Sequence, residues 1–408
     1  MMKVAIWLDA DYRPEEGGGF SYYDKLVKSL DSYAFDSHLD ICFVSNGDIK
    51  SLPLKREKHQ LTYKAQVSLC DKVKAHLPLY RDYFKPILTQ RYYKERQVAY
   101  RAQLRSLGVD IIYYLRQGER HVTEFPFIST NWDIGHWSTF AFPELVSNGE
   151  YTKRATFYRD VLPQALFVFA ESEAGKQELL KFTNISEEKI KVVPIFAGNC
   201  IEEQVTEDKQ VDILNQYGLD KYKYFFYPAQ FWAHKNHTNL VKAFADVNKK
   251  YPEYKLVFTG SDKGTKSYVQ SLVEQLGLKG KVVFAGFVEN NVINTLFKNA
   301  TALTMASFFG PTNMPPIEAM HIGCPVICTD LAGHREQLGS AALYFDAQDR
   351  KTITQCMEEM IANRDVYATA IMTQEKKSVF TIEEALKRIN RYLVEASQIR
   401  STWHDNLC

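Results

Sequence analysis

The sequence predicts an α/β protein with two domains, each built on a parallel sheet. Its 408 residues exceed what one typical hydrophobic core holds. Short apolar runs alternate with helix-like segments in both halves of the chain, which is the pattern of strand–helix–strand units. A polar run at 202–209 separates the halves. We therefore place a first domain at 1–200, a linker at 201–221, a second domain at 222–380 and a terminal helix at 381–408.

The composition is that of an ordinary soluble globular protein, with 45% hydrophobic and 24% charged residues. The formal net charge of +1 argues against a protein that binds nucleic acid over its whole surface. Seven scattered cysteines, without a Cys-x-x-Cys pair, indicate a reducing compartment. The N-terminal apolar run is too short for a signal peptide, and no run approaches the ~18 apolar residues of a membrane span. We therefore expect a cytoplasmic protein.

The first half of the chain contains six apolar runs that we predict to be strands of one parallel sheet. They cover residues 4–8, 39–44, 109–114, 127–130, 166–170 and 190–194. A helix is predicted from Ser21 to Leu30, directly after Gly17, Gly18 and Gly19. Glycines between a strand and a helix let backbone N–H groups approach a phosphate, although a flexible turn explains them equally well.

The sequence Asp9-Ala10-Asp11 has the form of a metal-binding Asp-x-Asp pair. It directly follows the first predicted strand, where a turn is the simpler explanation because Asp side chains bond to nearby backbone groups. We therefore predict no metal site here.

A basic and aromatic segment covers residues 54–105, with thirteen Lys or Arg against four Asp or Glu. The plain explanation is a pair of solvated amphipathic helices. The functional alternative is a surface for an anionic membrane or a phosphate-bearing acceptor. Nucleic acid is a weaker alternative, because no recognition motif accompanies the charge.

A polar loop follows the strand predicted at 127–130 and contains Asn131, Asp133 and His136. Open α/β sheets bind ligands at the carboxyl ends of their strands. We therefore treat His136 as a candidate site residue, and Asp133 as a residue that contacts the ligand or orients the loop.

The second half repeats the pattern, with strands predicted at 224–227, 255–258, 282–284 and 325–328. The loop after the first of these strands contains Lys235, just before a helix predicted from about Thr238. An ammonium group near a helix N-terminus can neutralise a diphosphate. A final amphipathic helix is predicted at 381–400.

The stretch from Phe308 to Met320 is predicted as a loop and a short helix. Pro315 and Pro316 suit the first turn of a helix, and Gly323 suits the position just past its end. Glu318 is then expected in the first turn, where free backbone N–H groups attract anions.

These stretches resemble glycosyltransferase family 4, whose members are retaining nucleotide-sugar transferases with two Rossmann-like domains (the GT-B fold). The likeness is most specific at 227–237 and 308–327 and extends over nearly the whole chain. Two positions depart from the family pattern. Gln230 stands where the family has an Arg, and Gly310 stands where it has the first of two Glu, of which Glu318 is the second.

The resemblance implies a role for the candidate residues. Lys235 would bind the donor diphosphate, Glu318 the ribose hydroxyls, and His136 would face the donor sugar, so these three are the expected catalytic residues. In addition to Lys235 and Glu318, the expected donor-binding residues are Gly18, Gly19, Asp133, Gln230, Phe287, Val288, Gly310, Thr312, Asn313 and Met314. The terminal helix would return to the first domain.

We therefore predict a retaining hexosyltransferase. It would move a sugar from a nucleotide-diphosphate sugar to a hydroxyl of a saccharide or a lipid-linked glycan, in cell-surface polysaccharide synthesis. No metal or other cofactor is expected, because side-chain cations and N–H dipoles can stabilise the leaving diphosphate. Two alternatives stay open: another GT-B chemistry, such as phosphorolysis or epimerisation, and a nucleotide-sugar-binding protein without catalysis, which Gly310 and Gln230 would explain.

Overall fold

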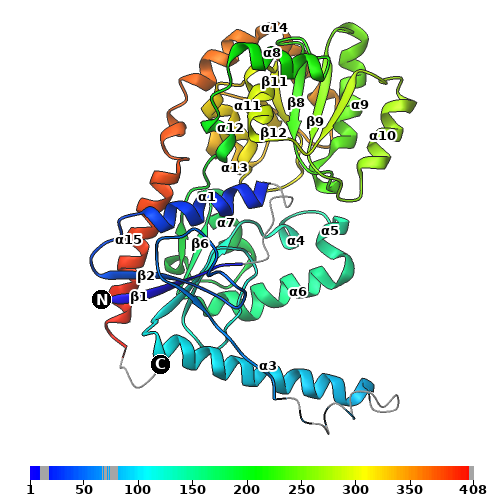
Figure 1. Cartoon of the computed structure of the whole chain (residues 1–408). Coiled ribbons are helices and arrows are strands. Elements are labelled where there is room, and N and C mark those ends of the chain that lie inside the picture. The colour runs from blue at the N-terminus through cyan, green and yellow to red at the C-terminus, as the bar shows by residue number, and fades with distance from the viewer. Residues whose placement is uncertain (10–17, 67, 69–70, 72, 74–80, 404–408) are drawn as a thin grey trace.

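A computed structural model describes residues 1–9, 18–66, 68, 71, 73 and 81–403. The chain forms two α/β domains, which are stacked along the long axis of the molecule (Figure 1). Each domain has one sheet with helices packed on its faces. The predicted class, two parallel-sheet domains, is therefore confirmed.

The first domain contains a seven-stranded sheet with the order β3-β2-β1-β4-β5-β6-β7. All neighbouring strands are parallel. The strands are β1 (Met2–Trp7), β2 (Leu39–Ser45), β3 (Lys58–Gln60), β4 (Ile111–Tyr114), β5 (Phe127–Asn131), β6 (Phe167–Ala170) and β7 (Ile190–Val192). The main helices are α1 (Gly18–Ser32), α3 (Arg81–Ser106), α4 (Gly135–Ser138), α5 (Pro143–Val146), α6 (Glu150–Thr156) and α7 (Glu173–Phe182).

The second domain contains a six-stranded parallel sheet with the order β10-β9-β8-β11-β12-β13. Its strands are β8 (Tyr224–Pro228), β9 (Lys255–Thr259), β10 (Val282–Gly286), β11 (Ala302–Met305), β12 (Val326–Thr329) and β13 (Leu343–Phe345). Its helices are α8 (Glu207–Gln216), α9 (His237–Lys250), α10 (Lys266–Gln275), α11 (Asn290–Asn299), α12 (Met314–Ile322), α13 (Ala332–Leu338) and α14 (Arg350–Met372).

In both sheets the strand order reverses beside the first strand of the domain, between β1 and β4 and between β8 and β11. Connections leave such a point in opposite directions and open a crevice at the carboxyl ends of the strands. The loops after β8 and β11 therefore meet at one place, facing the first domain.

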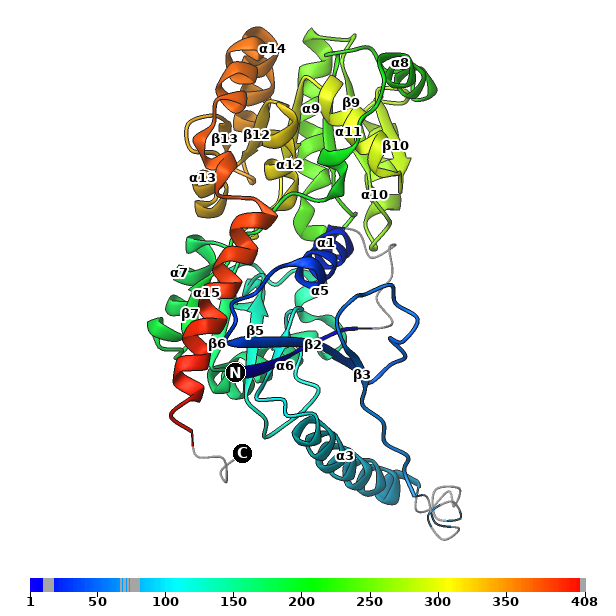
Figure 2. The same cartoon turned by 60° about the vertical axis from the view of Figure 1, so that its left-hand side comes forward.

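The region predicted as a linker, 201–221, contains α8. This helix packs against the second domain, because the Gln210 side chain accepts a hydrogen bond of 3.0 Å from the Asn299 amide of α11. The last helix, α15 (Ile382–Arg400), runs back along the first domain, as Figure 2 shows. Ion pairs tie it there, from Lys191 to Glu395 at 2.6 Å and from Arg400 to Asp110 at 2.9 Å.

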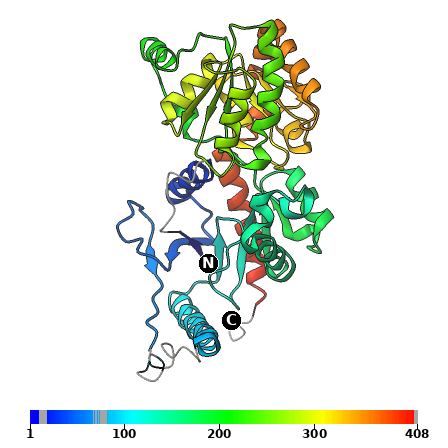
Figure 3. The same cartoon turned by 90° about the vertical axis from the view of Figure 1, so that its right-hand side faces the viewer.

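The basic segment includes α3, which lies at the end of the first domain that faces away from the second (Figure 3). None of the helices in the described parts of the chain has the length and apolar character that a bilayer span requires.

Candidate functional site

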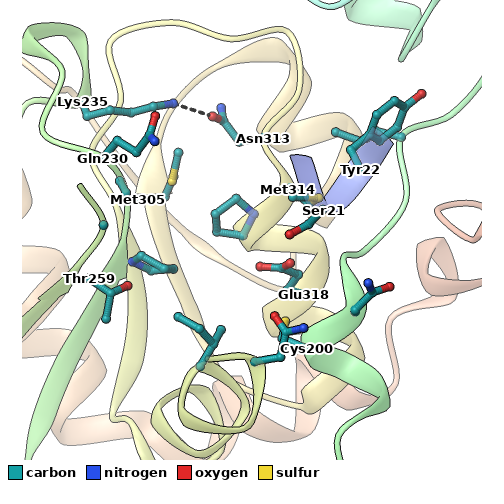
Figure 4. A pocket seen from close by; sticks show the side chains of 18 of the residues that line it. Ser21, Tyr22, Cys200, Gln230, Lys235, Thr259, Met305, Asn313, Met314 and Glu318 are labelled. Atoms are coloured by element: carbon teal, nitrogen blue, oxygen red, sulfur yellow. Dashed lines mark hydrogen bonds between the residues drawn. The ribbon is translucent and has the colours of Figure 1, made fainter. Parts of the chain in front are cut away.

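Two adjoining cavities lie between the domains, at the strand ends described above. The larger has a volume of about 650 Å³ and the smaller about 290 Å³. Both are lined by residues of the two domains, and they share Trp132, Glu171, Trp232, His234, Lys235, Thr312 and Asn313. Figure 4 shows part of the larger cavity, with Lys235 and Asn313 on one side and Glu318 below them. A ligand with two connected parts could therefore occupy both.

Helix α12 begins at Met314, and its prolines occupy the first turn as the sequence predicts. Gly323 ends the helix in the left-handed conformation, at φ 85°. Because the helix begins one residue before the prolines, Glu318 is its fifth residue. The expectation that Glu318 lies in the first turn is therefore wrong. Its carboxylate accepts a hydrogen bond from the backbone N–H of Gly198, at 3.3 Å, instead of capping its own helix.

Burial raises the pKa of Glu318, and hydrogen bonds from the Cys200 thiol and from Gly198 oppose that rise. Both donors lie on the connection between the domains, next to the larger cavity. Glu318 therefore fixes the connection and lines the cavity at the same time.

Lys235 is held by a chain of hydrogen bonds inside the second domain. Its Nζ donates to Asn313 Oδ1 at 3.1 Å, and Asn313 Nδ2 lies 3.0 Å from His334 Nε2. His334 Nδ1 lies 2.7 Å from the carbonyl oxygen of Thr329. A lysine only donates, so the amide oxygen must face it and the amide nitrogen must face the histidine. His334 is then neutral and carries its proton on Nδ1.

The charge states agree with this chain. Burial lowers the pKa of His334 to about 4, so the ring is neutral near pH 7. Close packing brings α13 to the loop, because a Cβ atom at Gly333 would lie only 1.7 Å from the carbonyl oxygen of Pro311. Gly333 therefore allows the approach that lets His334 reach Asn313.

The Lys235 ammonium has no carboxylate within 4.0 Å among the residues that the structure describes. Burial lowers its pKa to about 8, while the charges of Asp133 and Glu144 act in the opposite direction. An enclosed cation without a paired anion favours an anionic ligand. Because Lys235 lines both cavities, that anion would sit where they meet.

Three carboxyl groups of the first domain line the shared region or the smaller cavity. Asp133 accepts hydrogen bonds from the Arg154 guanidinium and, at 2.8 Å, from the Gly135 N–H. Glu144 accepts two hydrogen bonds from His234, at 3.0 Å from the backbone N–H and at 2.5 Å from the ring Nδ1. Glu171 accepts one from the Thr312 hydroxyl, at 2.7 Å. The last two join the domains across the site.

The structure places His136 behind the cavities, and it lines neither of them. Its side chain is buried, and its ring packs against Trp137 at 4.6 Å and Tyr158 at 4.9 Å between centroids. Burial, with a smaller contribution from the Arg154 charge, lowers its pKa to about 4. His136 is therefore neutral, and in this conformation it would act on a ligand only through the Asp133 loop.

The other predicted residues gather around the cavities. Gln230, Phe287, Val288, Thr312, Asn313 and Met314 line the larger cavity, and Asp133, Gly310, Thr312 and Asn313 line the smaller. The Gln230 amide is held by Trp232, at 3.1 Å, and by Ser261, at 3.0 Å. Gly18 and Gly19 begin α1, which brings Ser21 and Tyr22 to the larger cavity.

Part of the N-terminal prediction lies outside the described residues, namely Ala10, Asp11 and Gly17. Asp9 forms an ion pair with Arg116. Within the described ranges, no group of three His, Cys, Asp or Glu side chains is arranged to hold a metal ion.

Sequence reasoning missed Glu144, Glu171 and His334 as site residues. Glu171 directly follows β6, a position that could have drawn attention by the same argument as the Asn131 to His136 loop. His334 gave no such signal, because it lies 21 residues from the Asn313 side chain that it contacts.

Comparison with known proteins agrees with the resemblance found in the sequence. Residues 210–377, which include most of the second domain, match the family model of glycosyl transferases group 1. The O-antigen chain mannosyltransferase RfbU of Salmonella typhimurium is 28% identical over 228 residues, which cover 55% of this chain and 54% of that protein. O-antigen chain mannosyltransferase B of Escherichia coli is 23% identical over 242 residues, or 58% and 60% of the two chains. The chain spans about half the length of the curated relatives that it matches.

Solved structures share the architecture over almost the whole chain. Anabaena Alr3699/HepE in complex with UDP has a TM-score of 0.65 at 16% identity, covering 97% of this chain and 100% of the other. Sucrose-phosphate synthase from Thermosynechococcus elongatus has a TM-score of 0.68 at 18% identity, with the same coverage. At these identities the likeness shows the fold alone, and that fold is GT-B.

Proposed function

Because residues 210–377 match the family model of glycosyl transferases group 1, we propose that the protein is a glycosyltransferase with a nucleotide-diphosphate sugar as donor. We propose further that it retains the configuration of the sugar, needs no metal, and transfers a hexosyl unit to a hydroxyl of a saccharide or lipid-linked glycan in polysaccharide synthesis. Relatives named as O-antigen mannosyltransferases support this substrate class.

The observation that carries the proposal is the Lys235 ammonium, which faces both cavities without a carboxylate partner among the described residues. In glycosyl transfer, the bond from the anomeric carbon to the diphosphate breaks and negative charge develops on the leaving oxygen. A cation already held in place at that oxygen stabilises the transition state more than the ground state. The chain from Thr329 through His334 and Asn313 holds it there.

The larger cavity has the size and lining that a nucleoside diphosphate requires. Phe287, which is 62% exposed, and Val288 offer apolar surface for a base at the cavity margin. Glu318 offers a carboxylate for ribose hydroxyls, and the start of α12 adds the backbone N–H of Met314 beside the phosphates, since Pro315 and Pro316 carry none. The sugar would then extend past Lys235 into the smaller cavity.

The reaction needs no protein nucleophile under this proposal. The acceptor oxygen forms the new bond on the face that the diphosphate leaves, and the acceptor proton passes to the departing phosphate oxygen. Lys235 and the helix dipole balance the charge of the diphosphate, which is why no divalent cation is required. His136 would keep the Asp133 loop in place rather than transfer the proton.

A lipid-linked acceptor suggests contact with a membrane surface, and we assign it to α3. The helix carries seven Lys or Arg against two Asp or Glu. Lys85 and Lys94 are exposed, together with Val98 and Tyr93. Basic and apolar side chains on one exposed helix suit an anionic lipid surface.

The test is a thermal-shift screen with UDP, GDP and their sugar conjugates, followed by donor hydrolysis without acceptor. A ligand at 100 times its dissociation constant should stabilise the protein by about 2.7 kcal/mol. Slow release of nucleotide supports a transferase. Tight binding without release would identify a binding protein, and phosphate-dependent release of sugar phosphate would identify a phosphorylase.

A further inference from the structure

Glu171 is a buried carboxyl group that the proposed mechanism leaves unused. It follows β6, is 5% exposed, and lines both cavities at their junction. Its Oε2 accepts the hydrogen bond from Thr312, and no described residue bonds to its Oε1. Because Glu171 lines both cavities, this oxygen can accept a hydrogen bond from a hydroxyl group of a bound ligand.

Among the described residues, two other carboxyl groups line the smaller cavity, and each is bound by an arginine or a histidine. Asp133 is tied to Arg154 and the Gly135 N–H, and Glu144 is tied to His234. Glu171 differs from them because no cation lies within ion-pairing distance among the described residues. Among the described residues, it is therefore the carboxyl group of this cavity that neither an arginine nor a histidine binds.

Among the residues that the structure describes, the second domain supplies no acidic side chain to the smaller cavity. Gly310 lines the smaller cavity at φ +126°, a backbone conformation that favours glycine. A Cβ atom there would lie 2.9 Å from Asn313 Nδ2 and 3.0 Å from the Thr312 carbonyl oxygen. A longer side chain at this position would displace Asn313, which orients Lys235.

Aromatic side chains also line the two cavities. Trp132 and Trp232 line both cavities, and Phe309 lines the smaller one. Flat rings that pack on C–H surfaces, combined with a carboxyl acceptor for hydroxyls, suit a sugar ring.

We propose that the smaller cavity holds the transferred sugar and that Glu171 determines its specificity by accepting a hydrogen bond from one sugar hydroxyl. Thr312 orients the carboxyl group from the other domain. This inference rests on the proposed function and assigns its sugar recognition to the first domain. Burial raises the pKa of Glu171 to about 8, with a contribution from the Asp133 charge, and a hydroxyl donor would favour the ionised form.

The experiment uses the donor that the wild type hydrolyses fastest among UDP- and GDP-linked glucose, galactose, mannose and N-acetylglucosamine. Each sugar hydroxyl is replaced by hydrogen in turn. For one deoxy donor the wild type should lose about 10- to 100-fold in kcat/KM, the range for a hydrogen bond to a charged group. In Glu171→Ala that one loss should shrink to less than about threefold, while the losses for the other deoxy donors persist.

Three further variants separate recognition from structure. Thr312→Ser keeps the hydroxyl and should show the same losses of kcat/KM on the deoxy donors as the wild type. Thr312→Val should reduce the loss on the one deoxy donor that Glu171→Ala affects. Glu187→Gln changes an exposed carboxylate and serves as the control. UDP or GDP alone should bind Glu171→Ala within about twofold of the wild type, because neither carries the transferred sugar that Glu171 would contact.

This assignment would be overturned if the losses of kcat/KM on the deoxy donors were the same in Glu171→Ala as in the wild type, or if they changed equally for every deoxy donor. Either result would leave the proposed function standing. A wild type that neither binds nor hydrolyses any of these nucleotide sugars would overturn the proposed function and this inference with it.

Discussion

Replacing Lys235 with methionine should stabilise the unliganded protein while removing most of its activity. Methionine keeps an unbranched side chain of similar length but carries no charge. The pKa of Lys235 falls from 10.5 to about 8 because the ammonium is buried. At 1.36 kcal/mol per pKa unit, the buried charge costs at most about 3 kcal/mol, since water in the cavities screens part of it.

The pH dependence of stability shows whether the buried charge of Lys235 stabilises or destabilises the folded protein. Below pH 8 both the folded and the unfolded chain carry the proton, and the full cost is present. Between pH 8 and 10.5 the folded protein has lost a proton that the unfolded chain retains, so this residue makes stability rise with pH. In Lys235→Met that rise should disappear, and stability at pH 7 should increase. Urea unfolding of both proteins between pH 7 and 10 measures the difference.

Although Lys235→Met should be more stable, its turnover should fall about 10²- to 10³-fold at saturating donor. Such a loss is expected when a group that stabilises a leaving oxyanion is removed. Lys298→Met, at an exposed lysine near the end of α11, is the matched control and should change neither quantity appreciably. A Lys235→Met variant with normal turnover, or one less stable than the wild type at pH 7, would refute the reasoning.

Three other outcomes follow from the same geometry. Asn313→Asp should place a carboxylate about where the amide oxygen now lies, 3.1 Å from the ammonium, and form an ion pair that weakens UDP or GDP binding at least about tenfold; unchanged binding by calorimetry would contradict the role given to the bare cation. Activity should survive EDTA, and restoration of an EDTA-treated sample by Mg²⁺ or Mn²⁺ would require a metal in the mechanism. Co-sedimentation with anionic liposomes should weaken as salt rises and in the double variant Lys85→Glu/Lys94→Glu; salt-independent binding, or none, would leave α3 as an ordinary solvated helix.

Most of the fold could be predicted because buried parallel strands are continuous apolar runs. The three missed strands are β3, β11 and β13, and they lack that signal for different reasons. Lys58–Gln60 is a polar edge strand of three residues, and Leu343–Phe345 is an edge strand of the same length. Ala302–Met305 is buried, but Thr301 and Thr304 interrupt the apolar run there.

The half of the site that lies in the second domain was also accessible from the sequence. Lys235 and Asn313 follow adjacent strands of one sheet, so the strand order alone brings them together. What the sequence could not show is the side-chain orientation. Asn313 was expected to bind the donor, and the structure shows that its amide oxygen faces Lys235 and its amide nitrogen faces His334. At most one N–H of that amide is left for a ligand.

The half that lies in the first domain depends on how the two domains meet, and that is a long-range property. Glu171 meets Thr312 across 141 positions, and Glu144 meets His234 across 90. A third carboxylate joins the domains in the same way, since Glu336 accepts hydrogen bonds of 2.9 and 2.8 Å from the backbone N–H groups of Glu173 and Ala174.

The Glu336 contact shows why sequence reasoning stops at this boundary. Helix α7 needs partners for its first N–H groups, and Ser172 provides one locally by accepting a hydrogen bond from Gly175 at 2.9 Å. That cap is visible in the sequence. The second partner, Glu336, comes from α13 of the other domain, where a carboxylate also favours the positive end of the α7 dipole. Since α13 also carries His334, which orients Asn313, the element that holds the first domain in place is the one that positions Lys235. The sugar recognition that we propose for the first domain and the diphosphate recognition that we propose for the second would therefore depend on the same seven-residue helix.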